Sequence, residues 1–140
     1  TNLPDLPIDR HMTYGDMRRA IIDLPVAVSS ALLPEGWQGA YCDEDKVILI
    51  DRRLTYSGKR CTLVHELVHW WYGDDDCSNA RSRQERRTRT QTALLLVDPM
   101  ELAALERMYD DMWSIANELN VTTQVLTDYR QILSEHACIV

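Results

Sequence analysis

The stretch His65-Glu66-Leu67-Val68-His69 constrains this chain more than any other. Its H-E-x-x-H pattern suits a helix, because about 100° of rotation per residue puts His65 and His69 one turn apart on one face. Both imidazoles can then reach one metal ion, while Glu66 at the edge of that face reaches a water on the metal. Two nitrogen ligands beside a carboxylate base are typical of a zinc hydrolase, so the pattern predicts one Zn²⁺ per chain.

A third protein ligand is expected, because a catalytic zinc is normally held by three side chains and a water. No third histidine follows at the short spacing of H-E-x-x-H-x-x-G-x-x-H. The remaining candidates are Asp74 and Asp76, in the acidic run after the motif, and Glu85. We favour Glu85, because it is the only acid in the helical stretch 80–97, whereas the acidic run is expected to form a solvated loop.

Short apolar runs predict three strands in the first half of the chain. A helix is expected over 13–24, and strands are expected at 26–28, 37–42 and 46–51. The polar residues 43–45 predict a reversal, so the last two strands should pair in antiparallel fashion. We therefore expect a small three-stranded sheet of antiparallel type.

Helical periodicity dominates the second half of the chain. Thr55 is the expected N-cap of the helix that carries the motif and runs to about Trp71. Three further helices are expected, over 80–97, over 99–108 and from about 122 onward. Residues 112–119 either continue the third helix or form one of their own. The predicted fold class is α+β and mostly helical.

Length and composition indicate one ordinary globular domain. The chain has 140 residues, of which 45% are hydrophobic and 26% are charged. No apolar run approaches the roughly 18 residues that a membrane span requires, so no membrane association is expected. Residues 13–140 are predicted to form a single domain. Residues 1–12 are expected to be an N-terminal arm or to derive from a cloning vector, because His11-Met12 matches a common cloning junction.

Charge and cysteine content bear on partners and location. A net charge of -7 argues against direct binding to nucleic acid, because phosphate contacts need Lys and Arg. The four cysteines include no C-x-x-C pair. We expect reduced thiols and a cytoplasmic protein.

Three segments around the motif carry a family resemblance. Residues 50–54 read I-D-R-R-L, residues 60–69 read R-C-T-L-V-H-E-L-V-H, and E-R-R at 85–87 leads to A-L-L-L at 93–96 and Pro99. From about Trp37 onward the chain resembles the ImmA/IrrE family of small metallopeptidases, in the forms carried by actinobacterial phages and mobile elements.

The resemblance implies a fold, a site and a partner. The family's fold is a small sheet beside a helical, zincin-like core. Zinc would be held by His65, His69 and Glu85, a gluzincin arrangement, with Glu66 as the general base. The best-characterised members cut a helix-turn-helix repressor and so relieve repression, which makes such a repressor the expected substrate.

Three positions depart from the family's pattern. Thr88, Arg89 and Gln91 stand where the family usually has an alanine, an aspartate and a large apolar residue. The missing aspartate leaves the partner of a zinc-binding histidine unassigned.

The expected chemistry is metal-assisted hydrolysis of an amide bond by an endopeptidase. Glu66 would take a proton from the activated water and pass it to the leaving amine. The developing oxyanion needs a further donor, and the sequence does not choose among four candidates. These are Tyr41, Tyr56, Tyr72 and His136.

Several residues have two interpretations. Cys61, one turn before His65, is either a soft metal ligand or, as we favour, part of the core. Trp70 and Trp71 either shape a substrate groove or pack in the core. The arginines of 81–89 form a basic band, which is either a solvated helix face or a docking site for an acidic surface of a substrate protein.

Two other functions remain open. Residues 115–133 resemble a helix-turn-helix, which would make the chain a DNA-binding regulator. The second helix offers only Arg130 as a cation, alongside Asp128, so a plain helical hairpin is favoured. The remaining alternative is a zinc-containing interaction module that binds a repressor without cutting it.

Overall fold

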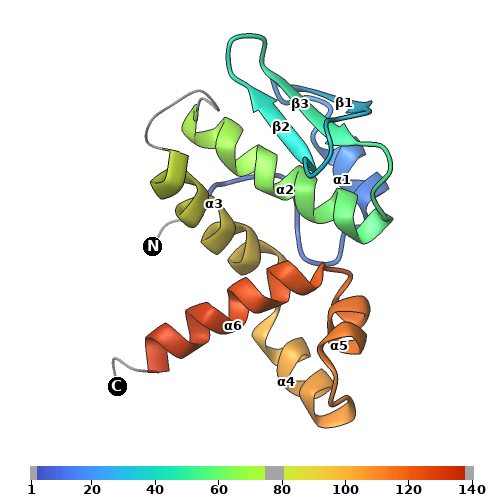
Figure 1. Ribbon diagram of the computed structural model, residues 1–140, viewed down its shortest axis with the longest axis vertical. Coiled ribbons are helices and arrows are strands. Elements are labelled where there is room, and N and C mark those ends of the chain that lie inside the picture. Colours follow the sequence, from blue (N-terminus) through green and yellow to red (C-terminus); the bar gives the residue numbers. More distant parts are fainter. Residues whose placement is uncertain (1–2, 75–80, 138–140) are drawn as a thin grey trace.

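The computed structural model describes residues 3–74 and 81–137. Figure 1 shows α2 lying between the small sheet on one side and the helices α3 and α6 on the other. The predicted α+β class is confirmed. In chain order the elements are α1 Tyr14–Ala20, β1 Ala27–Ala31, β2 Gly39–Cys42, β3 Val47–Asp51, α2 Tyr56–Tyr72, α3 Arg81–Leu96, α4 Pro99–Met108, α5 Met112–Leu119 and α6 Thr123–Ala137.

The sheet is mixed, with strand order β1-β3-β2. Strands β2 and β3 pair in antiparallel fashion across the predicted reversal, where Lys46 has a φ of 54°. Strand β1 is parallel to β3, with Ala27 opposite Val47, so antiparallel pairing throughout is wrong for this strand. The chain leaves β1 and crosses to the far edge of β3 before it turns back, which places β2 at the edge of the sheet beside α2.

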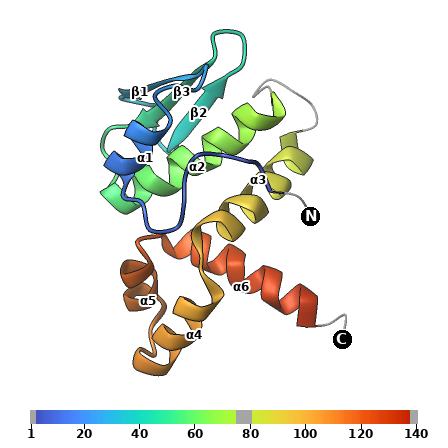
Figure 2. The ribbon, with the colours of Figure 1, turned by 180° about the vertical axis from the view of Figure 1, so that it is seen from behind.

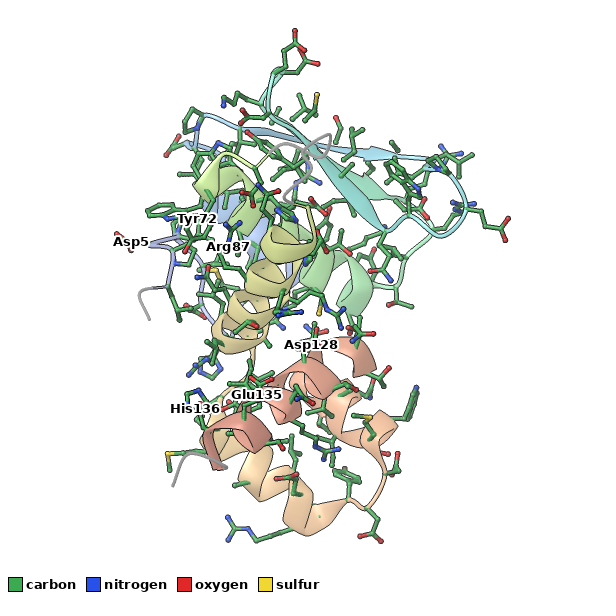
Figure 3. All side chains as sticks on the ribbon, turned by 60° about the vertical axis from the view of Figure 1, so that its left-hand side comes forward. Asp5, Tyr72, Arg87, Asp128, Glu135 and His136 are labelled. Carbon is green, nitrogen blue, oxygen red and sulfur yellow. The ribbon has the colours of Figure 1, made fainter. Side chains whose placement is uncertain are left out.

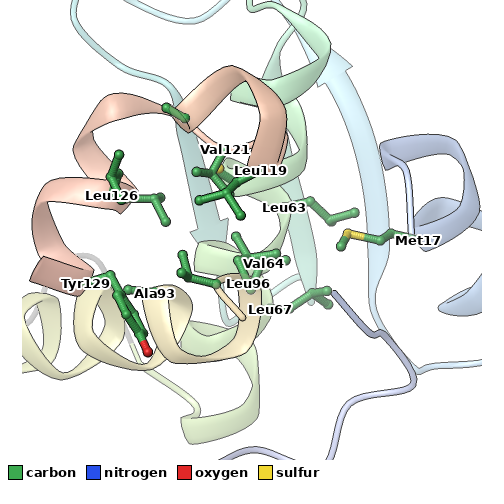
Figure 4. Packing of buried hydrophobic residues seen from close by; sticks show 14 of the residues in the cluster. Met17, Leu63, Val64, Leu67, Ala93, Leu96, Leu119, Val121, Leu126 and Tyr129 are labelled. Atoms are coloured by element: carbon green, nitrogen blue, oxygen red, sulfur yellow. The ribbon is translucent and has the colours of Figure 1, made fainter. Parts of the chain in front are cut away.

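Helix α2 has well-defined ends and a buried middle. The hydroxyl of Thr55 accepts a hydrogen bond from the Gly58 amide at 3.1 Å, as the predicted N-cap requires. Gly73 ends the helix in the left-handed conformation, with a φ of 67° that suits glycine. Figure 4 shows Leu63 of α2 directed toward Met17 of α1, whereas Leu96, Leu119 and Leu126 lie on the other side of α2. The helix is therefore apolar on two sides, which fits its place between the sheet and α3.

Residues 112–119 form a helix of their own and do not continue α4, because each of the two helices has its own N-cap. Asp98 accepts from the Met100 amide at 2.9 Å and Pro99 occupies the first turn of α4. Asp111 accepts from the Ser114 amide at 2.8 Å and so starts α5. None of the helices in the described ranges combines the length and the apolar character needed to cross a bilayer.

The N-terminal residues from 3 onward lie against the domain (Figure 2). The side chain of Leu6 is buried, and the guanidinium of Arg10 donates to the Leu94 carbonyl at 2.9 Å. Arg60 of α2 is only 1% exposed and donates to the carbonyls of Met12 at 2.7 Å and Asn120 at 2.9 Å. It also donates to the Arg10 carbonyl at 2.7 Å. This single side chain therefore ties the N-terminal segment and the α5–α6 turn to α2.

Replacing Arg60 by alanine is expected to lower the free energy of unfolding by about 3–5 kcal/mol, because three backbone carbonyls lose their donor and a buried volume is left unfilled. Urea denaturation of the purified protein measures this change. The matched control is Arg19→Ala, which removes an exposed arginine paired with Asp16 at 2.6 Å and is expected to change stability little. Equal destabilisation by both substitutions would contradict the role of Arg60.

Candidate metal centre

The two histidines of the motif and Glu85 converge on one point. His65 and His69 lie one turn apart on α2, with ring centroids 4.9 Å apart. Helix α3 packs against α2 and places Glu85 Oε1 2.7 Å from His69 Nε2 and 3.3 Å from His65 Nε2. One ligand atom from each residue lies within 4.8 Å of the others, so the three predicted ligands form a cluster that could hold a metal ion.

The chemistry of this cluster fits a divalent ion such as zinc. Two imidazole nitrogens and one carboxylate oxygen are a common set of protein ligands in catalytic zinc sites. Hydrogen bonds from His65 and His69 hold the pKa of Glu85 well below its usual range, so it is an anion. Burial acts to lower the pKa of His69, but hydrogen bonds to Glu85 and Asp74 outweigh it and raise the pKa to about 9. A metal ion at Nε2 would therefore replace a proton.

Asp74 supplies the histidine partner that the sequence left unassigned. Its Oδ2 lies 2.7 Å from His69 Nδ1, and the Thr88 hydroxyl lies 3.4 Å from the same nitrogen. With only 6% of Asp74 exposed, the expectation of a solvated loop is wrong for this residue. A carboxylate on Nδ1 fixes the ring so that Nε2 faces the cluster. Asp76 lies outside the described residues.

Arg87 holds Asp74 in place. Its Nη2 donates to Asp74 Oδ2, and its guanidinium lies over the ring of Tyr72, 3.8 Å from the centroid. Figure 3 shows Tyr72 and Arg87 side by side. Gln91 of α3 donates to the Tyr72 hydroxyl at 2.8 Å. The end of α2 is therefore bound to α3 through polar contacts that surround His69.

The basic band is only partly a solvated helix face. Arg87 pairs with Asp74, and Arg89 pairs with Asp128 of α6, whereas Arg86 is exposed. The side chains of residues 81–83 are not among those that the structure describes.

An open cavity of about 530 Å³ lies in front of the cluster. Its walls come from the segment leading into β2, from α2 and α3, and from the first turns of α6. The lining residues are Gly36, Trp37, Gln38, Gly39, Cys61, Thr62, His65, Glu66, His69, Glu85, Arg89, Thr92, Thr122, Gln124, Val125 and Asp128. Glu66 thus lies in the same cavity as the three candidate metal ligands.

Gly39 allows the edge strand to approach Glu66 closely. A Cβ atom at this position would lie 2.5 Å from Thr62 Cγ2 and 3.3 Å from Glu66 Oε2. Any larger residue would push β2 away from α2. Sequence reasoning missed Gly39, Trp37 and Asp128 as site residues, because no local pattern links them to the motif. It treated Arg89 only as one arginine of the basic band, although its four-residue spacing from Glu85 on one helix could have placed it on the same face.

The four candidate oxyanion donors lie elsewhere in the described structure, and none lines the cavity. Tyr41 is buried and donates to Asp43 at 2.8 Å. Tyr56 is exposed beside Lys59, and His136 is exposed in the last turn of α6. Tyr72 contacts Arg87 and Gln91, as described above. The cavity instead offers hydroxyl groups from its threonines as donors.

Cys61 and the tryptophans also have defined places. Cys61 is buried at the cavity wall, where its sulfur accepts from the Thr122 amide at 3.4 Å, and it lies outside the cluster of three ligands. Trp70 packs against the core, and Trp71 is exposed. Neither lines the cavity, whereas the half-exposed Trp37 does. Cys77 and Cys138 lie outside the described residues.

The chain matches a known family model. Residues 22–128 match the Peptidase M78 model, which is described as an IrrE N-terminal-like domain. This range includes the motif, Glu85 and every lining residue of the cavity. A search of curated proteins finds no match.

The cluster predicts one zinc ion per chain, and Glu85→Ala is expected to lose or strongly weaken it. Asp74→Ala should weaken zinc binding by about 10–100-fold, because His69 loses the partner that orients it. Asp74→Asn should weaken it less, since the amide oxygen still accepts from Nδ1. Titration against a chromophoric chelator measures these affinities, with the exposed Asp23→Ala as control. Full zinc occupancy in Glu85→Ala would refute the assignment of this ligand.

Cys61 is expected to react with iodoacetamide at least about tenfold more slowly than the exposed Cys42 at mildly alkaline pH. Burial raises the pKa of the Cys61 thiol, and the Thr122 amide and the charge of Arg60 offset this only in part. Less of the reactive thiolate is therefore present. Peptide mapping by mass spectrometry separates the two sites. Equal rates in the folded protein would contradict the buried position of Cys61.

Proposed function

The chain belongs to the IrrE N-terminal-like family of peptidases, and on that premise we propose that it is a zinc-dependent endopeptidase. The observation that carries the proposal is the convergence of His65, His69 and Glu85 within 4.8 Å, beside Glu66 in an open cavity. A structural zinc site would be closed by four protein ligands. Three ligands that face an open cavity are instead typical of a site that admits water and substrate.

Each residue of the site has a defined part in peptide hydrolysis. His65, His69 and Glu85 would hold the zinc ion, which when bound supplies an activated water and polarises the scissile carbonyl. Glu66, next to His65 on α2, would act as the general base that accepts a proton from the attacking water and would then donate it to the leaving amine. Asp74 keeps the His69 ring in place through Nδ1. The edge strand β2 passes Glu66 at Gly39 and bounds the site on that side.

We further propose that the substrate is a helix-turn-helix repressor of a phage or mobile element, cut in the cytoplasm to relieve repression. Support comes from the family resemblance, since its best-characterised members act on such repressors. The open cavity is compatible with a segment of a protein chain, because its walls come from four separate parts of the fold.

The position of α6 argues against a role as a free DNA-recognition helix. Gln124, Val125 and Asp128 of this helix form a wall of the cavity. Helix α6 also packs extensively against α3. The first turns of the supposed recognition helix are thus part of the metal-site cavity, which favours the helical hairpin over the DNA-binding alternative.

Glu66→Gln is expected to lower the rate of cleavage by about 100-fold or more, because glutamine cannot accept the proton of the attacking water. Zinc content should stay unchanged, since Glu66 is not among the three ligands of the cluster. The substrate for this test is a purified helix-turn-helix repressor from the genetic element that encodes this chain. Gel electrophoresis and mass spectrometry follow its cleavage, with and without a chelator.

The same variant separates the enzyme from an interaction module. If wild type and Glu66→Gln relieve repression equally in a reporter assay, binding without cutting is the mechanism. A repressor that stays intact with the zinc-loaded wild-type protein would overturn the proposed cleavage.

A further inference from the structure

We propose that Arg89, held by Asp128, forms a subsite beside the metal centre that binds an acidic side chain of the substrate. The inference deepens the proposed peptidase function and rests on it. Nothing in the H-E-x-x-H motif or its ligands requires an arginine at this position. The chain nevertheless places one in the cavity wall.

The guanidinium of Arg89 is fixed in direction by α6. Its Nε donates to Asp128 Oδ2 at 3.1 Å and its Nη2 donates to Asp128 Oδ1 at 2.6 Å. Asp128 in turn accepts from the Gln124 side chain at 3.0 Å. Figure 3 places Asp128 where α6 approaches α3. This two-point contact holds the arginine in one orientation, so little conformational freedom is lost when a ligand binds.

In the Arg89–Asp128 pair, the arginine is more exposed to solvent than the aspartate. The side chain of Arg89 is 48% exposed, whereas that of Asp128 is 14% exposed. Nη1 has no hydrogen-bond partner among the described residues, so the outer edge of the guanidinium keeps N–H donors for a ligand. A planar fork of donors matches the two oxygens of a carboxylate. A cationic side chain at the same place would be repelled by the guanidinium.

The position of Arg89 suits a residue close to the scissile bond. Arg89 follows Glu85 by one helical turn, which separates their Cβ atoms by about 5–6 Å. An extended peptide advances about 3.3–3.6 Å per residue. With the scissile carbonyl at the metal, Arg89 therefore meets a side chain one or two residues away. Thr92 follows on the same face of α3, and its buried hydroxyl has no hydrogen-bond partner among the described residues.

Two series of quenched fluorescent peptides test the subsite. Each series has an alanine-rich sequence in which a single residue, Glu in one and Gln in the other, is moved through successive positions. Wild-type protein is expected to cleave the Glu peptide at least about tenfold more efficiently at one or two positions, mainly through a lower KM. Arg89→Gln should remove this preference. Arg89→Glu should instead cleave most efficiently a further peptide that has Lys at the same position.

The matched control is Arg130→Gln, which removes the same charge from an arginine that pairs with Glu106 and does not line the cavity. It should keep the full preference for Glu. Zinc content, measured for every variant, separates loss of the subsite from loss of the metal centre. Equal cleavage of Glu and Gln peptides by wild type, or a preference that persists in Arg89→Gln, would overturn the subsite and leave the peptidase function standing.

A binding measurement can support the subsite even if the peptidase function fails. Fluorescence anisotropy with the Glu66→Gln protein measures peptide affinity without turnover. If wild type cuts no peptide but Glu peptides bind more tightly through Arg89, the subsite stands and the peptidase function fails. If peptides of neither series bind or are cut, the subsite is refuted as well.

Discussion

The crossing of α2 and α3 at His69 is the contact on which the site depends. One ring nitrogen of this histidine faces Glu85 of α3, and the other faces Asp74 at the end of α2. The imidazole is almost fully buried, so each nitrogen needs a polar partner at this distance. The pair of helices and the cluster of candidate ligands are therefore stabilised by the same contacts. Any shift of α3 along α2 would separate Glu85 from both histidines at once.

The charged side chains beside His69 compensate one another's charges. Asp74 is paired with both His69 and Arg87, and the Arg87 guanidinium also lies over the Tyr72 ring. Thr88 is fully buried and places its small hydroxyl near the same nitrogen of His69. The carboxylate that orients a histidine comes from the end of α2, and α3 contributes the arginine that holds this carboxylate.

The cavity explains why residues far apart in the chain act together. Gly39 lets the edge strand come close to Glu66, while α6 brings Asp128 to Arg89 across 39 positions of sequence. Trp37 adds an apolar surface at the same opening. The site is thereby bounded by a sheet edge and by three helices. A protein segment entering it would meet the candidate metal centre and the fixed guanidinium within one helical turn of each other.

The sequence by itself determined the features that depend on near neighbours. The i, i+4 spacing of His65 and His69, the Thr55 cap and the reversal before β3 all act within a few residues, so their outcome could be predicted. Glu85 could be chosen as the third candidate ligand because it is the only acid in the helical stretch 80–97. Tertiary structure alone decided that β1 runs parallel to β3, that Asp74 is buried against His69, and that Arg89 meets Asp128. These contacts join distant segments, and their geometry is set by how the whole chain packs rather than by any local preference.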